Sequence, residues 1–233
     1  MARSFLKKVY EMFTRPGDRS DPRNYFTWVY RHHAWGGERS RSGPGSEGAF
    51  AAQKIEVVNS ILHDFEIRSV LDLGCGDFFW MREVMKDVDR YLGIDVVSSL
   101  VDENKRKYAS GSVSFQCLDL SDIAEQARLA EKSFDLAICF DVIGHLLNDE
   151  VDRLLSFVIE ELDIRYFLVT NRHDAQSERY LVRPKTRHEG INIQKHPLFA
   201  RLHAMPVFTQ EARYPGDFFE LYDFGARRDI RSP

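Results

Sequence analysis

The sequence predicts an α/β fold built on a doubly wound, mostly parallel sheet, and two observations support this prediction. Residues 70–73, three of them apolar, lead into a turn that contains Gly74 and Gly76, as expected where a buried strand passes into a helix. Three more strand-like runs follow at residues 91–95, 112–119 and 134–141. Each ends in an aspartate, so parallel strands would gather three carboxylates at one edge of the sheet.

The glycine turn limits which ligand can bind. The single residue between Gly74 and Gly76 lets the backbone approach a ligand closely, so we expect a charged ligand group there. A dinucleotide-binding turn has a third glycine three positions after the second, and Phe79 occupies that position, so the sequence disfavours NAD. A helix is expected to begin at Asp77, whose charge suits a helix N-terminus, with aromatic residues after it that pack on the sheet.

The next two strands favour a nucleoside ligand. Asp95 ends the second strand, 19 residues after Gly76, where a doubly wound fold places an acid that binds ribose hydroxyls. Asp119 ends the third strand, where its carboxylate can accept a hydrogen bond from an adenine amino group. Either aspartate alone would be interpreted as a helix cap or a turn residue, but their recurrence favours a binding site.

These motifs resemble, in order, those of class I S-adenosylmethionine-dependent methyltransferases: Asp72-x-Gly74-x-Gly76, Asp95, Asp119, and the segment from residues 134–136 through Asp141 to His145. The run at residues 76–81, Gly-Asp-Phe-Phe-Trp-Met, resembles a bacterial subgroup, whereas many family members have glycine in place of Phe78. The resemblance implies a Rossmann-like methyltransferase fold with seven strands. It also implies the cofactor S-adenosyl-L-methionine, with S-adenosyl-L-homocysteine as product. The cofactor-binding residues that it implies are Asp72, Gly74, Cys75, Gly76, Asp77, Asp95, Val96, Asp119, Leu120 and Asp141.

Residues 34–46 are rich in glycine and serine and predict a loop, with Ser46 as the N-cap of a helix that runs to about Phe65. In the same subgroup a Trp and then Arg-Ser-Gly-x-Gly-Ser precede the first strand. The resemblance therefore implies that this loop covers the cofactor with Trp35 and Arg41. A flexible surface linker is the alternative.

The chain is expected to divide into a basic N-terminal extension, residues 1–46, and a methyltransferase domain, residues 47–233. Apolar residues between positions 5 and 13 share one face of a short helix, which would touch a membrane surface or pack on the domain or a second subunit. Residues 1–41 hold nine basic and four acidic residues, so we expect an anionic group nearby.

Asp141 and His145 follow the fourth strand, where open parallel sheets bind their ligands, and they are the predicted catalytic residues. Methyl transfer to a hydroxyl needs an aligned acceptor and removal of a proton, which suits His145 as a general base. A structural His145 that caps the helix expected at about residues 148–162 is the alternative. Catechol-type, metal-dependent relatives carry Asp-Asn after the fifth strand, but here Thr170 precedes Asn171, so we predict no metal.

The predicted acceptor side begins at Asn171 and Arg172, where the expected fifth strand, residues 164–171, ends. Residues 165–201 contain eight basic and three acidic residues. We expect an insertion at about residues 172–206 to cover the acceptor, which would carry a phosphate or carboxylate, as a nucleotide sugar or a glycan does; a solvated basic loop is the alternative. Residues 207–210 and 218–224 are expected to form an antiparallel C-terminal hairpin. The predicted substrate-binding residues are Asn171, Arg172, Arg183 and Arg187.

Composition limits the remaining choices. A chain of 233 residues that is 43% hydrophobic fits one large domain. Its net charge of −4 argues against a grip on long nucleic acid, so nucleic acid is not a favoured partner. Three cysteines without metal-binding spacing favour a reducing cytoplasm, and no apolar run approaches the roughly 20 residues that span a bilayer. We expect a soluble protein whose oligomeric state stays open.

The predicted function is methyl transfer from S-adenosylmethionine to an oxygen of a small-molecule or carbohydrate acceptor. Methylation of a nitrogen on a small molecule stays open, as does a module that binds S-adenosylmethionine without turnover. The sequence does not identify the acceptor.

Overall fold

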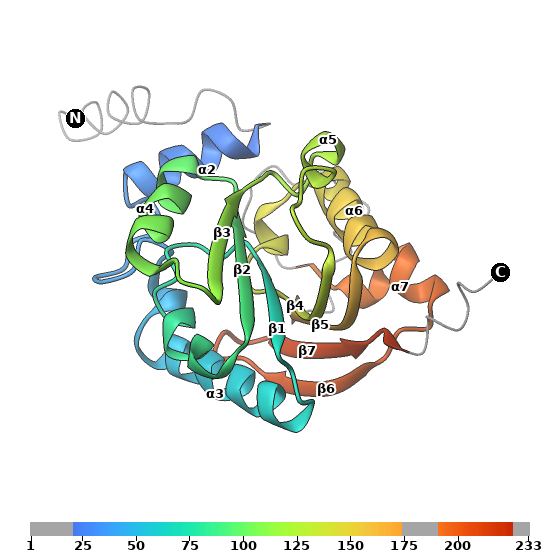
Figure 1. Ribbon diagram of the computed structural model, residues 1–233. Coiled ribbons are helices and arrows are strands. Elements are labelled where there is room, and N and C mark those ends of the chain that lie inside the picture. The colour runs from blue at the N-terminus through green and yellow to red at the C-terminus, as the bar shows by residue number, and fades with distance from the viewer. Residues whose placement is uncertain (1–20, 174–190, 226–233) are drawn as a thin grey trace, which may run out of the picture.

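The computed structural model describes residues 21–173 and 191–225, and it contains the predicted seven-stranded sheet (Figure 1). The strand order is β3-β2-β1-β4-β5-β7-β6, and β7 runs antiparallel to both of its neighbours. The predicted fold class, including the antiparallel C-terminal hairpin, is confirmed. The strands are β1 (Ser69–Leu73), β2 (Arg90–Asp95), β3 (Val113–Cys117), β4 (Ser133–Cys139), β5 (Asp163–Arg172), β6 (Pro206–Glu211) and β7 (Asp217–Asp223).

Helices cover the sheet on both faces, which explains why its central strands are apolar throughout. In β4, four successive residues from Leu136 to Cys139 are completely buried. Helix α3 (Gly48–Asp64) packs on one face, and α6 (Asn148–Ser156), its π-helical continuation (Phe157–Glu161) and α7 (Pro197–Arg201) pack on the other. Helix α4 (Ser98–Tyr108) contacts β2 and β3, and the short α5 (Ile123–Gln126) follows β3.

Helix α2 (Pro22–Arg31) is an element that the sequence analysis did not predict. Its side chains Tyr25, Phe26, Val29 and Tyr30 are buried in the same cluster as residues of β1, β4 and α6. The Asp21 carboxylate caps the helix by accepting a hydrogen bond from the Asn24 N–H. The expected N-terminal extension therefore contributes to the core, while the division at residue 46 stays a prediction.

Two expected helix starts are corrected by the structure. No helix begins at Asp77; after the glycine turn the chain forms 3-10 turns at Met81–Glu83 and Met85–Asp87. Pro44–Ser46 is itself a 3-10 turn, so α3 begins at Gly48 and its N-cap is Glu47 rather than Ser46. At both positions a carboxylate binds the loop at residues 38–47 instead, because Glu47 accepts the Glu38 N–H and Asp77 accepts the Arg41 N–H.

Some expectations fall outside the described residues. The amphipathic helix expected at residues 5–13 and residues 174–190 of the basic insertion belong to this part of the chain. Within residues 21–173 and 191–225, none of the helices combines the length and apolar character that crossing a bilayer requires.

Candidate functional site

The turn after β1 brings the backbone to the carboxyl edge of the sheet. Gly74 and Gly76 both have positive φ values, +87° and +57°. A Cβ at Gly74 would collide with the Val142 side chain, and one at Gly76 would collide with the Ser42 hydroxyl. These two glycines are therefore required by the packing of neighbouring segments against the turn, and their N–H groups donate to the Ile94 carbonyl and to Asp95.

Asp95, at the end of β2, is tied to the same turn. Its Oδ2 accepts a hydrogen bond from the Gly76 N–H at 3.1 Å, and its Oδ1 accepts one from the Val97 N–H at 2.9 Å. Burial raises the pKa of Asp95 to about 6 against the effect of these hydrogen bonds. The Asn104 amide donates to the Gly76 carbonyl from α4, so the turn is held both by β2 and by α4.

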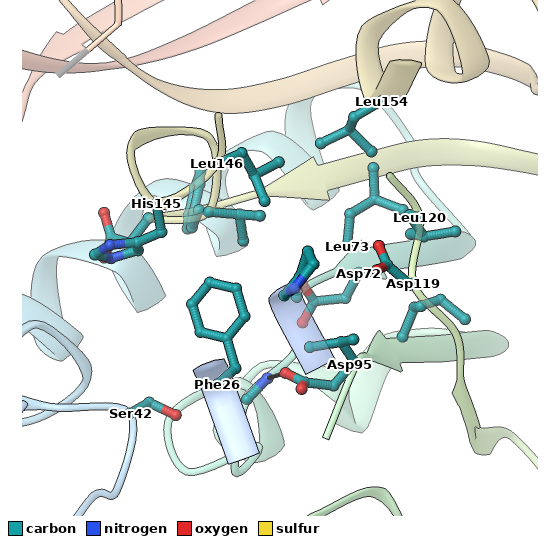
Figure 2. A pocket seen from close by; sticks show the side chains of 18 of the residues that line it. Phe26, Ser42, Asp72, Leu73, Asp95, Asp119, Leu120, His145, Leu146 and Leu154 are labelled. Carbon is teal, nitrogen blue, oxygen red and sulfur yellow. Dashed lines mark hydrogen bonds between the residues drawn. The ribbon is translucent and has the colours of Figure 1, made fainter. Parts of the chain in front are cut away.

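A cavity, here called cavity A, lies against this edge (Figure 2). Asp72, Asp95 and Asp119 lie on one side of it, and Phe26 and His145 lie on the other. Ten predicted residues line cavity A: Trp35, Asp72, Gly74, Gly76, Asp95, Val96, Asp119, Leu120, Asp141 and His145. The parallel strands and the segment after α2 have thus brought together residues that are up to 110 positions apart in the chain.

Arg41, Cys75 and Asp77, which were also predicted to bind the cofactor, do not line cavity A. Asp77 instead holds the preceding loop, because its carboxylate accepts hydrogen bonds from the Arg41 N–H at 2.8 Å and from the hydroxyls of Ser40 and Ser42. Arg41 is exposed beyond this contact, and Cys75 is buried against Gly93 on the far side of the turn.

A second cavity, here called cavity B, adjoins cavity A beyond the ends of β4 and β5. Trp35, Ser42, Asp141 and His145 line both cavities. The residues that line cavity B alone include Gly45, Gly144, Thr170, Asn171, Arg172, Ile191, Tyr214 and Asp217. Of the predicted substrate-binding residues, Asn171 and Arg172 line this cavity, whereas Arg183 and Arg187 lie outside the described residues.

Asp141 stands at the junction of the two cavities in a left-handed conformation, with φ of +57°. Its N–H donates to the Thr170 hydroxyl at 2.7 Å, and its Oδ2 lies 2.5 Å from the Nζ of Lys54. His145 belongs to a 3-10 turn, Ile143–His145, and its ring stacks on that of Trp35 with centroids 5.2 Å apart. The predicted catalytic pair and the predicted loop aromatic therefore meet at this junction.

The polar groups of cavity B are mostly paired with one another. Arg172 lies 3.7 Å from the Asp217 carboxylate and donates to the Pro215 carbonyl. The Asn171 side chain is buried; its amide donates to Glu220 at 2.7 Å and its carbonyl accepts from the Ile193 N–H at 2.8 Å. Burial raises the pKa of Asp217, with the Arg172 charge opposing the shift and Asp141 adding to it. Asn171 thus anchors the chain at Ile193 as well as facing the cavity.

Several residues of the site were not predicted from the sequence. Phe26 and Tyr30 of α2 and Lys54 of α3 line cavity A, as does Trp80. Lys54 could have been found from the sequence, because it shares an apolar helical face with Ala51, Val58 and Ile61. A lysine buried on such a face needs a charged or polar partner. Among the described residues, no three His, Cys, Asp or Glu side chains come together as a metal site requires, and the absence of a metal stays a prediction.

The sequence comparisons agree with this geometry. Residues 70–162 match the family model described as a methyltransferase domain. The small RNA 2'-O-methyltransferase of Gallus gallus is 25% identical over 118 residues, which are 46% of this chain and 31% of that protein. Phosphoethanolamine N-methyltransferase 1 of Zea mays is 26% identical over 108 residues, which are 46% of this chain and 21% of that protein. This chain thus spans less than a third of either relative.

The fold is also similar to solved structures. One is the N-methyltransferase NodS of Bradyrhizobium japonicum in complex with S-adenosyl-L-homocysteine, with a TM-score of 0.63 and 13% identity over 84% of this chain and 97% of that one. Residues 70–162 therefore match a methyltransferase domain, and the fold is similar to that of a solved methyltransferase, which agrees with the predicted class. The relatives methylate different kinds of acceptor, so they do not determine the acceptor of this chain.

Proposed function

We propose that this chain transfers the methyl group of S-adenosylmethionine to a hydroxyl oxygen of a small-molecule or carbohydrate acceptor that binds in cavity B. The observation that carries the proposal is the wall shared by the two cavities, formed by Trp35, Ser42, Asp141 and His145. A cofactor in cavity A and an acceptor in cavity B would meet there. A module that only binds the cofactor would not need the second cavity.

The residues of cavity A fit the parts of the cofactor. The Asp95 carboxylate suits the ribose hydroxyls, and Asp119, whose Oδ1 accepts from the Ser121 hydroxyl at 2.6 Å, suits the adenine amino group. Gly74 and Gly76 have no side chains, so the turn suits a close approach by the amino-acid portion of the cofactor. When bound, the cofactor supplies an activated methyl group on a sulfonium. The protein has to align the acceptor, exclude water and accept the hydroxyl proton.

Cavity B favours an acceptor rich in hydroxyl groups. It presents the carboxylates of Asp141 and Asp217, which accept hydrogen bonds, together with the ring of Tyr214, on which the face of a sugar can pack. Lys54 pairs with Asp141 and Arg172 pairs with Asp217, so these four side chains give cavity B no excess of positive charge. A phosphate or carboxylate on the acceptor would depend on Arg183 and Arg187, and this part stays a prediction.

His145 is the proposed general base, with Asp141 orienting the acceptor beside it. The hydroxyl proton must leave as the methyl group arrives, and an imidazole at the shared wall is suitably placed to take it. If so, His145→Gln should lower kcat about 100-fold and leave the affinity for S-adenosylhomocysteine unchanged. Equal kcat values for His145→Gln and the unaltered protein would assign His145 a structural role.

Isotope transfer tests the proposal directly. The purified protein is incubated with methyl-labelled S-adenosylmethionine and, in separate reactions, neutral glycosides, nucleotide sugars, small amines and a short RNA. We expect labelled methyl ethers of hydroxyl-bearing small molecules and release of S-adenosylhomocysteine. Labelled amines alone would replace the proposal with N-methylation, and cofactor binding without label transfer to any acceptor would favour the binding module. Stabilisation by NADH and not by S-adenosylhomocysteine in a thermal-shift assay would contradict the cofactor itself.

An RNA hydroxyl is the second candidate acceptor, because the Gallus gallus relative is a small RNA 2'-O-methyltransferase. The chemistry at the shared wall would be the same, and the RNA arm of the assay decides between the two acceptors. We also propose membership of the bacterial subgroup, on the basis of the motifs at residues 35–46 and 76–81, and a cytoplasmic location. The three free cysteines support that location.

A further inference from the structure

Lys54 is a lysine on the buried face of α3. Only 5% of its surface is exposed, and its neighbours on that face, Ala51, Val58 and Ile61, are buried apolar residues. Lysine is almost never buried without a partner, because removing an ammonium group from water is costly. The position therefore requires an explanation beyond helix packing.

The partner of Lys54 is Asp141 at the junction of cavities A and B. The Nζ atom lies 2.5 Å from Oδ2 of Asp141 and 5.7 Å from the centre of the Trp80 ring. The two side chains differ in exposure, since that of Lys54 is 6% exposed and that of Asp141 is 42% exposed. Lys54 thus holds the carboxylate from the protein side and leaves it open toward the cavities.

The backbone of Asp141 also needs to be held. A non-glycine residue with φ of +57° is in a sparsely populated conformation and persists only where its surroundings fix it. The Thr170 hydroxyl holds the Asp141 N–H from β5, and Lys54 holds the carboxylate from α3. Because the Lys54 ammonium group is buried, the cost of removing it from water offsets much of its attraction to Asp141, so stability alone does not account for a lysine here.

We propose that Lys54 is a positioning residue for the acceptor: it fixes the Asp141 carboxylate at the junction of the two cavities, where that carboxylate accepts a hydrogen bond from an acceptor hydroxyl. This inference rests on the proposed function and adds a residue to it. Lys54 acts through Asp141 and takes no part in proton transfer.

Binding measurements separate this role from a direct contact with the cofactor. Lys54→Met is compared with Lys107→Met, which also removes a helical lysine beside a carboxylate, but at an exposed site on α4. We expect Lys107→Met to bind S-adenosylhomocysteine and 5'-methylthioadenosine within about threefold of the unaltered protein. Because Lys54 lines cavity A without holding the cofactor carboxylate, Lys54→Met should change the two affinities by the same factor. 5'-Methylthioadenosine lacks the amino-acid carboxylate of the cofactor. If Lys54→Met weakened the binding of S-adenosylhomocysteine but not that of 5'-methylthioadenosine, Lys54 would hold this carboxylate and the inference would be wrong.

Kinetics test whether Lys54 acts through Asp141. For an acceptor found in the labelling assay, Lys54→Met should raise the acceptor KM about tenfold and change kcat less. Lys54→Met leaves the Asp141 carboxylate without its charged partner, and the double variant Lys54→Met/Asp141→Asn removes that charge as well. The double variant should have the same acceptor KM as Asp141→Asn alone. Additive effects in this cycle would show that Lys54 acts independently of Asp141.

A crystal structure of Lys54→Met with S-adenosylhomocysteine needs no acceptor. We expect the Asp141 carboxylate to turn away from its position and φ to leave the left-handed region. An unchanged Asp141 would overturn the inference even if the protein methylates an acceptor. A displaced Asp141 in a protein that methylates nothing would overturn the proposed function and support the role of Lys54 in positioning Asp141.

Discussion

Asp95 shows how one side chain links the sequence pattern to the site. It was predicted from its place at the end of a strand, and the structure puts its carboxylate in cavity A, where it accepts hydrogen bonds from the N–H groups of Gly76 and Val97. A carboxylate held in this way still has lone pairs for other donors. Its binding to the cofactor ribose is a proposal that substitution can test.

We predict that Asp95→Asn weakens the binding of S-adenosylhomocysteine about tenfold, because an amide replaces two acceptors with one acceptor and one donor. Isothermal titration calorimetry measures the change. Asp135→Asn is the matched control, since Asp135 also accepts two backbone N–H groups, from Arg68 and Ser69, but does so outside cavity A. Wild-type affinity in Asp95→Asn would exclude the proposed ribose contact.

The burial of Phe78 could be predicted from the sequence, but its backbone conformation could not. Core packing was expected for most aromatic residues after the glycine turn, and Phe78 is buried against Tyr91, Tyr108 and Phe115. The sequence does not indicate that its φ is +57°, a conformation that glycine adopts more easily. This conformation gives a physical reason for the glycine that many class I methyltransferases have here, and for the missing helix at Asp77.

At the scale of elements, the loop at residues 38–47 is built by two carboxylates. Glu47 accepts the N–H groups of Glu38, Arg39 and Ser40, and Asp77 accepts that of Arg41. The hydrogen bonds from Glu38 and Arg39 lower the pKa of Glu47. Residues of this loop line both cavities, and its N–H groups are held by hydrogen bonds; that the loop covers the cofactor stays a prediction.

We predict that Asp77→Ala loosens this loop and reduces cofactor affinity, although Asp77 does not line cavity A. The lost hydrogen bonds each contribute about 1 kcal/mol, so amide exchange at residues 40–42 should become faster by about tenfold or more. Hydrogen-exchange mass spectrometry and calorimetry with S-adenosylhomocysteine measure the two effects. Asp122→Ala, which removes the N-cap of α5, is the control. Faster exchange with unchanged affinity would mean that the loop does not cover the cofactor.

Helix α2 was not predicted, although its sequence contains evidence for it. Asp21 and Pro22 are a recognisable helix start, but the aromatic and β-branched residues that follow have modest helix propensity. Packing of Phe26 and Tyr30 stabilises the helix, and Arg23 attaches it by donating to the Val96 carbonyl and to Glu125. The buried residues at positions 25, 26, 29 and 30 do repeat with helical spacing, so the helix had a periodic signal, whereas its distant partners could not be predicted.

At the scale of the whole molecule, the sequence predicts the sheet well because its strands are buried on both faces and short turns separate them from helices. The strand-end aspartates could be placed together for the same reason, since parallel strands bring their carboxyl ends to one edge. Cavity B was less predictable. It depends on Tyr214 and Asp217 in the hairpin, which meet Asp141 only through the tertiary fold.

The carboxylates at the sheet edge should also control how stability depends on pH. Burial raises the pKa of Asp72 to about 7; the hydroxyl of Tyr91 and the charge of Lys54 oppose the shift, and Asp95 adds to it. A carboxyl whose pKa is raised by folding contributes stability that is fully present below its unfolded pKa and is lost as the pH rises through the folded value. Between about pH 4 and pH 7, Asp72 should therefore make the cofactor-free protein less stable as the pH rises.

We predict that Asp72→Asn, which cannot ionise, gains stability relative to the unaltered protein by up to about 1.4 kcal/mol per pH unit across this window, with no further gain above it. Urea unfolding at several pH values measures the difference. Asp135→Asn should behave oppositely: burial disfavours the Asp135 charge, but hydrogen bonds from Ser69 and Arg68 outweigh it and lower the pKa. That variant should be less stable at pH 7 and lose its disadvantage below about pH 4. A difference for Asp72→Asn that stays constant from pH 4 to pH 8 would show that Asp72 remains ionised at the edge of the sheet.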